Sequence, residues 1–85
     1  MGYCIVVSKR VQKELDSLPK AIYAHIREQI IALRNDPRPS GVKKLRGYTS
    51  TYRVRVGEYR IVYEVDDSAQ EIHLLHVADR KDVYR

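Results

Sequence analysis

Apolar and polar residues alternate along residues 52–56, and strand character returns from residue 59 to residue 65. This alternation is typical of two β-strands that each bury one face. Gly57 and Glu58 lie between the two stretches, and glycine supplies the positive φ that a two-residue type II′ turn needs at its first position. The pattern therefore predicts a β-hairpin whose register is fixed by its short turn.

That register sorts the side chains of the hairpin onto two faces, because paired residues share a face. The apolar face, predicted to pack on a core, carries Tyr52, Val54, Val56, Tyr59, Ile61, Tyr63 and Val65. The other face carries Arg53, Arg55 and Arg60, with Arg55 directly opposite Arg60. Such a like-charged pair costs up to about 1 kcal/mol. A bound phosphate would remove that cost, since a guanidinium can place two donors on it. The alternative is a solvated face whose arginine stems cover apolar surface.

A strand and two helices are predicted ahead of the hairpin. Residues 3–7 form the strand, and Ser8 is the expected N-cap of a helix that opens at Lys9. The apolar stripe of this helix is Val11, Leu15 and Leu18. The stripe of the second helix is Ile22, Ile26, Ile30 and Leu33. Pro19 is expected in the first turn of that helix, and Asp36-Pro37 stops it. His25 lies off the stripe and is expected on the surface, without metal-ligand partners.

Two further segments flank the hairpin. Residues 42–47 are predicted to be a short strand or extended segment with three positive charges, at Lys43, Lys44 and Arg46. These side chains could follow a phosphate backbone, or simply protect an edge strand. Residues 72–78 are predicted as the last strand, central in the sheet and covered on both faces. His73 and His76 have opposite parity, so only one of them is expected on the arginine side.

Length and charge limit the possible functions. The 85 residues make one domain, residues 1–85, with no room for a cleft between domains. The net charge of +5 and the pI near 9.5 fit a polyanionic partner, and they also fit an ordinary basic protein. Cys4 is the one cysteine, predicted to be buried in the first strand of a protein from a reducing cytosol. No signal peptide or membrane span is expected, so a membrane is not an expected partner.

Three motifs in this order resemble the RelE/ParE superfamily of bacterial and archaeal toxins, and RelE-type members most closely. They are KLRG at residues 44–47, YRVRVGEYRIVY at residues 52–63 and VADRKDVYR at residues 77–85. The resemblance implies an α+β, RelE-like fold. It begins with the N-terminal strand and a two-helix hairpin, and continues with an antiparallel sheet and a short C-terminal turn.

The resemblance also implies a function. RelE-type members are toxins of type II toxin–antitoxin systems that enter the ribosomal A site and cleave mRNA there. The 2′-OH of the RNA attacks the adjacent phosphate, and no metal or cofactor is used. The implied partners are a cognate antitoxin, the ribosome and mRNA, in the cytoplasm. Any DNA contact of the toxin–antitoxin complex is expected through the antitoxin.

Carried over by position, the resemblance assigns roles to five residues. Arg53 and Arg55 match the paired basic positions of the family, and Arg60 matches the phosphate-binding arginine. Arg80 matches an arginine that contacts phosphate or protonates the leaving group, and Tyr84 matches the tyrosine that stacks on or positions the mRNA. Further RNA-binding side chains are expected at Lys43, Lys44, Arg46 and Lys81.

The chain departs from the family where a general base is expected. RelE has lysines where this chain has Arg53 and Arg55, and an arginine cannot act as a base near neutral pH. Many relatives have a histidine where this chain has Asp79. Asp79 is therefore the first candidate for the base, and Tyr84, a histidine of the last strand and a ribosomal group are the others. Asp79 could also simply pair with its basic neighbours.

Two other functions compete with RNA cleavage. One is a ParE-like inhibitor of DNA gyrase with the same fold. The other is a basic RNA-binding domain without chemistry, which the missing base leaves open. The arginine set and Tyr84 favour the endoribonuclease.

Overall fold

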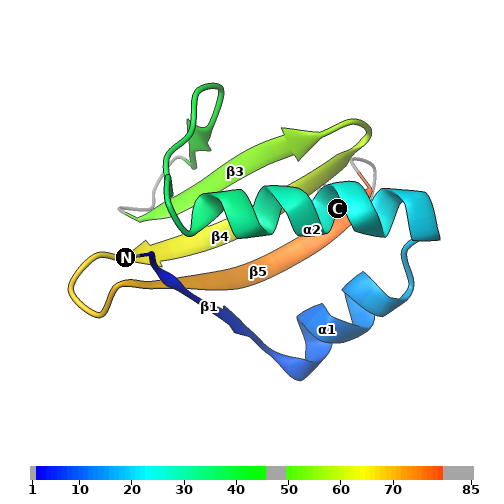
Figure 1. The fold of residues 1–85 in the computed structure, drawn as a ribbon, viewed down its shortest axis with the longest axis horizontal. Helices are drawn as coiled ribbons and strands as arrows, with labels where there is room; N and C mark the ends of the chain where they lie inside the picture. Colours follow the sequence, from blue (N-terminus) through cyan, green and yellow to red (C-terminus); the bar gives the residue numbers. More distant parts are fainter. Residues whose placement is uncertain (1, 46–49, 80–85) are drawn as a thin grey trace.

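The computed structural model describes residues 2–45 and 50–79, which form an α+β sandwich of two layers (Figure 1). The elements are β1 (Cys4–Val7), α1 (Lys9–Asp16), α2 (Lys20–Leu33), β2 (Lys43–Lys44), β3 (Thr51–Val56), β4 (Tyr59–Asp66) and β5 (Glu71–Asp79). The strands make one five-stranded sheet in the order β1-β5-β4-β3-β2. Residues from both helices pack into one core with one face of this sheet, and neither α1 nor α2 covers the opposite face.

The predicted hairpin and its register are confirmed. β3 and β4 pair antiparallel around the turn at Gly57, which has φ +61°. Val56 pairs with Tyr59 and Arg55 pairs with Arg60, as the two-residue turn requires. The apolar side of the hairpin contributes Tyr52, Val54, Ile61, Tyr63 and Val65 to the buried core, with Val56 and Tyr59 partly buried against it.

The sheet is mixed: β2 to β5 pair antiparallel, as predicted, and the N-terminal strand adds one parallel pairing. β1 runs parallel to β5, and Val7 pairs with Leu74. Parallel strands need a long crossover, and here the two helices provide the start of one. This pairing brings together strands from the two ends of the described chain. The sequence could not predict its direction, because the alternation of residues along a strand is the same for a parallel and an antiparallel partner.

The helices follow the predicted caps and stripes closely. The Ser8 hydroxyl oxygen accepts a hydrogen bond from the Val11 amide at 3.2 Å and so caps α1. Pro19 stands just before α2, and α2 ends at Leu33, ahead of Asp36-Pro37. The buried stripe residues of the helices are Val11, Leu15, Ile26, Ile30 and Leu33. His25 is exposed, as predicted. No helix in the described part of the chain is long and apolar enough to cross a membrane.

Two burial predictions were wrong. Cys4 is exposed, because β1 is an edge strand and Cys4 pairs with Glu71 on the face without helices. β5 is central, as predicted, yet only its helix-side residues are fully buried, at Ile72, Leu74 and Val77. Its other face stays half-exposed, because neither α1 nor α2 covers that side of the sheet.

A polar cluster ties the loop after α2 to the sheet. Arg38 donates to Tyr52 Oη at 3.0 Å and to Asp67 at 2.8 Å, and the Tyr3 hydroxyl donates to Asp67 at 2.6 Å. These hydrogen bonds, from Tyr3 first and then Arg38, lower the pKa of the Asp67 carboxyl. The buried Tyr63 hydroxyl donates to the Pro37 carbonyl at 2.6 Å, and burial raises the pKa of Tyr63 to about 12. The cluster thus fixes one end of the sheet, away from the hairpin turn.

Candidate active site

The sheet face opposite the helices gathers the basic residues of the hairpin. We call it the arginine face and define it by Lys43, Arg53, Arg55, Arg60, Val62, His76 and Ala78. One row across the strands is Arg55, Arg60 and Ala78. The next row is Lys43, Arg53, Val62 and His76. Directly paired side chains begin about 5 Å apart, so the cationic groups can converge on one small anion.

The three arginines differ in how firmly they are held. Arg55 is exposed and Arg53 is half-buried. Arg60, on the central strand β4, is only 3% exposed, although the helices pack on the other side of the sheet. A guanidinium is costly to bury and is tolerated where its surroundings compensate its charge. Arg60 is therefore a buried, well-fixed cation, and Arg55 is an exposed one placed directly opposite.

The two strand histidines lie on the same face, so the parity prediction was wrong. Val62 pairs with His76, and the next residue of β4, Tyr63, pairs with Leu74. Leu75 is thus the extra residue of a β-bulge, which a residue count along β5 cannot anticipate. Beyond the bulge His73 pairs with Glu64, which has the same parity as Val62. Of the two histidines, His76 is the one in the row of Arg53.

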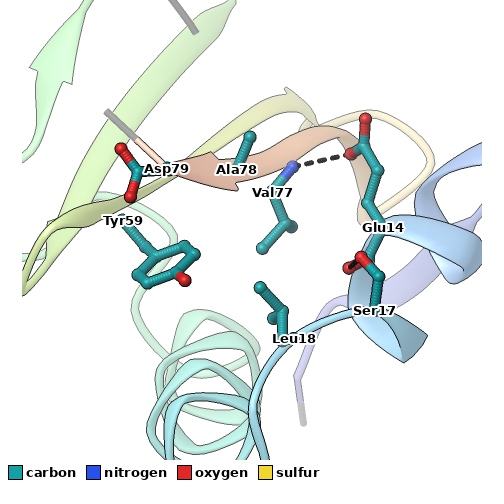
Figure 2. A pocket seen from close by; sticks show the side chains of 7 residues that line it. All are labelled: Glu14, Ser17, Leu18, Tyr59, Val77, Ala78 and Asp79. Atoms are coloured by element: carbon teal, nitrogen blue, oxygen red, sulfur yellow. Dashed lines mark hydrogen bonds between the residues drawn. The ribbon is translucent and has the colours of Figure 1, made fainter. Parts of the chain in front are cut away.

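Glu14 of α1 closes the edge of β5 at this point, because β1 ends at Val7 and leaves that edge uncovered. One Glu14 carboxylate oxygen accepts a hydrogen bond from the Val77 amide at 2.9 Å, as Figure 2 shows. The other carboxylate oxygen lies 3.3 Å from His76 Nδ1. Sequence reasoning missed Glu14, since nothing in the pattern of α1 separates it from an ordinary surface carboxylate.

Asp79 lies away from the arginine face. It pairs with Tyr59, whose side chain packs toward the helix-side core. Both residues line a pocket of about 320 Å³ with Glu14, Ser17, Leu18, Val77 and Ala78, seen in Figure 2. The register therefore does not bring the first candidate for the base together with Arg55 and Arg60. Asp79 as general base remains a prediction.

The basic side chains expected around the arginines are only partly described. Lys43 lies in the Arg53 row, whereas Lys44 pairs with Tyr52 on the opposite side. Both lysines are exposed on the short edge strand β2. The remaining predicted residues, Arg46, Arg80, Lys81 and Tyr84, lie outside the described residues. Within residues 2–45 and 50–79, no group of three or more histidine, cysteine and acidic side chains could hold a metal ion.

Comparison with known proteins decides the family. The family model described as "ParE toxin of type II toxin-antitoxin system, parDE" matches residues 5–84. The chain belongs to the RelE/ParE toxin superfamily. Among curated relatives, the toxin is 31% identical to the putative toxin RelE1 of Methanocaldococcus jannaschii, with 100% of this chain and 98% of the relative covered. It is 30% identical to toxin RelG of Mycobacterium tuberculosis, with 100% and 99% covered.

Solved structures give the same family and confirm the RelE-like fold. The toxin superposes on RelE in the archaeal RelE–RelB complex of Pyrococcus horikoshii with a TM-score of 0.83, at 36% identity over 94% of this chain and 97% of that chain. The RelBE2 complex of Mycobacterium tuberculosis matches with a TM-score of 0.81, at 28% identity over 94% and 100%. The toxin is thus the toxin of a type II toxin–antitoxin system, as its motifs predicted.

Proposed function

We propose that this toxin is a ribosome-dependent endoribonuclease that cleaves mRNA in the A site, in the cytoplasm. The observation that carries the proposal is the confirmed pair of Arg55 and Arg60, with Arg53 in the next row of the same face. A sheet without a function in anion binding would be more stable without this like-charged pair. A phosphate between the guanidinium groups turns the repulsion into two charge-assisted contacts.

The proposed reaction needs no group beyond the RNA and the protein. The 2′-OH loses its proton and attacks the neighbouring phosphorus, the 5′-oxygen leaves with a proton, and a 2′,3′-cyclic phosphate remains. Negative charge accumulates on the phosphorus oxygens in the transition state. Arg60, held in place by burial, can stabilise that charge without reorganising, which is the most effective form of electrostatic catalysis, and Arg55 adds a second cation opposite it. Arg80 and Tyr84 retain the proposed roles in leaving-group protonation and mRNA positioning.

The proposed second partner is a cognate antitoxin, because relatives of this fold were solved in complex with RelB. An apolar groove of about 230 Å³ between β1, α1 and α2 is available for it. The large hydrophobic side chains that the described residues leave exposed, Val7, Tyr23 and Ile31, all line this groove. β1 is also an edge strand of the sheet that the described residues form. An amphipathic antitoxin segment that folds on binding would cover these features.

The test is primer extension on an mRNA in a reconstituted translation system, with and without ribosomes. The proposal predicts cuts at A-site codons only when ribosomes are present, and loss of these cuts in Arg55→Ala. If the toxin stops growth but cleaves nothing in either reaction, the endoribonuclease is wrong. A supercoiling assay with purified gyrase then tests the ParE-like alternative, in which Arg55 is not required.

A further inference from the structure

The Glu14–His76 contact gives one histidine of the arginine face a defined chemical state. A carboxylate can only accept hydrogen bonds, so the 3.3 Å contact requires the proton of the neutral ring to be on Nδ1. Nε2 then carries a lone pair and can accept a proton. Glu14 is itself held by the Val77 amide at 2.9 Å, and the His76 side chain is 44% exposed. The ring is thus oriented on one side and accessible on the other.

The β-bulge places this ring beside the arginines. His76 occupies the row of Arg53, two strands away, at about 10 Å between backbones. It is a diagonal neighbour of Arg60, which pairs with Ala78, and such neighbours lie about 7–8 Å apart. Both side chains are long enough to meet at one nucleotide. A count along β5 that ignores the bulge would put His76 and His73 on opposite faces, whereas the extra residue Leu75 leaves both on the same face.

From these observations we propose that His76 is the general base of the cleavage reaction and that Glu14 is its positioning residue. The inference rests on the proposed endoribonuclease function and deepens it. Nε2 takes the proton of the 2′-OH as the oxygen forms its bond to phosphorus. The bond from phosphorus to the 5′-oxygen breaks, and a separate acid, the role proposed for Arg80, protonates that oxygen. The imidazolium then returns its proton to water, so no oxidant, reductant or metal takes part.

Charged groups of both signs lie near His76. Glu14 of α1 contacts the ring, Arg53 of β3 lies in its row and Arg60 of β4 is its diagonal neighbour. Glu64 of β4 lies on the same face, two residues beyond Val62, and Arg10 of α1 binds the Leu75 carbonyl at 2.8 Å.

The chain provides a matched control for the experiment. His73 lies on the same face, has a carboxylate partner in Glu71 at 3.0 Å and is exposed to a similar extent, 37% against 44%. Its row contains Glu64 and no arginine. The variants to compare are His76→Gln, His76→Ala, Glu14→Gln and His73→Gln. Single-turnover cleavage of A-site mRNA is measured between pH 5.5 and 8.5, together with ribosome binding and thermal stability.

The expected result separates the two histidines. His76→Gln loses 100-fold or more of the cleavage rate, the usual contribution of general base catalysis, while ribosome binding stays unchanged and His73→Gln cleaves like wild type. Imidazole added to His76→Ala restores part of the rate, which a purely structural role would not allow. In Glu14→Gln the amide oxygen still accepts from Val77 and the NH₂ faces Nδ1. The ring proton then moves to Nε2, and the rising limb of the pH profile is lost in a folded protein.

Two outcomes contradict the inference in distinguishable ways. If the wild-type toxin cleaves and His76→Gln cleaves as fast as His73→Gln, His76 is not the base. The same conclusion follows if His76→Ala is folded and impaired but is not rescued by imidazole. Both results leave the proposed endoribonuclease function intact. A wild-type toxin that cleaves no mRNA on the ribosome overturns the proposed function, and with it this inference.

Discussion

At the scale of single residues, the pair Arg55–Arg60 is expected to lower the stability of the fold while it serves the proposed phosphate binding. Arg55 is exposed and opposite a buried cation, so Arg55→Ala removes repulsion while removing little burial. We expect its free energy of unfolding to stay the same or rise by up to about 1 kcal/mol, while the cleavage rate falls by about 100-fold. Urea denaturation and primer extension measure the two effects.

The control for Arg55→Ala is Lys20→Ala, which removes one positive charge from α2, on the other side of the sheet. It is expected to change neither property noticeably. A large loss of stability in Arg55→Ala would show that Arg55 supports the fold. The Arg55–Arg60 pair would then no longer indicate an anion-binding site.

The arginine positions could be predicted from the sequence because a two-residue turn leaves one register for the hairpin. The same reasoning failed one strand further on. The Leu75 bulge shifts parity without any glycine or proline to signal it, so the shared face of His73 and His76 emerged only from the pairing with β4. Glu14 and its partner Val77 are 63 residues apart in the sequence, so no local sequence pattern could predict their hydrogen bond.

At the scale of elements, α1 covers the part of the β5 edge that β1 does not pair with. β1 pairs with residues 71–74 of β5 and then ends, and α1 continues along the same edge through Arg10 and Glu14. The sequence predicted both elements but not this relation, because pairing direction and strand order depend on the whole chain. The parallel β1–β5 pair is the clearest case, since a strand of four residues fits either direction.

The buried hydroxyl of Tyr63 makes stability sensitive to alkaline pH. Burial raises the pKa of Tyr63 to about 12, above its ordinary value of 10.0, so the folded protein favours the neutral phenol. This contribution to stability is complete below pH 10 and is lost as pH rises toward 12. We expect the melting temperature to fall across that interval.

The comparison for this pH dependence is Tyr63→Phe, which is less stable at neutral pH because it loses the hydrogen bond to Pro37. Its melting temperature is expected to change less between pH 10 and pH 12 than that of wild type. Equal slopes for the two proteins would assign the alkaline transition to other groups.

The apolar groove between β1, α1 and α2 gives a prediction for antitoxin binding. Ile31 is 44% exposed and lines the groove, so Ile31→Lys places a charge where an apolar antitoxin side chain is proposed to pack. We expect at least a tenfold loss of antitoxin affinity by calorimetry, with unchanged cleavage by the free toxin.

The control is Gln29→Lys, which places the same charge on an exposed position of α2 outside the groove. Unchanged antitoxin affinity in Ile31→Lys would place the antitoxin elsewhere on the toxin.

At the scale of the whole molecule, the charge on the face without helices is divided. Lys43 and the three arginines lie toward the hairpin turn, while Glu64, Asp66 and Glu71 lie at the far end of β4 and the start of β5. A single-stranded RNA is therefore expected to cross near the turn and to be repelled from the other end.

This division predicts a salt dependence for binding. The affinity for a single-stranded RNA or an mRNA-programmed ribosome is expected to fall with ionic strength, and each phosphate contact contributes about 0.7 to the logarithmic slope. Arg55→Ala is expected to lower that slope by about one contact, whereas Glu71→Gln, at the acidic end, leaves it unchanged or steeper. Filter binding over a range of salt concentrations measures both, and identical slopes for wild type and Arg55→Ala would exclude Arg55 from phosphate binding.

The bulge at Leu75 also bears on how a gene for this fold can change length. Leu75 stands opposite no residue of β4, so losing its codon would join two correctly paired halves of β5 and keep each side chain on its present face. Losing a codon between Ile61 and Val65 would instead invert one half of β4 and expose its core residues. Single-codon deletions in natural variants of this toxin should therefore accumulate at position 75 and be rare in the neighbouring strand.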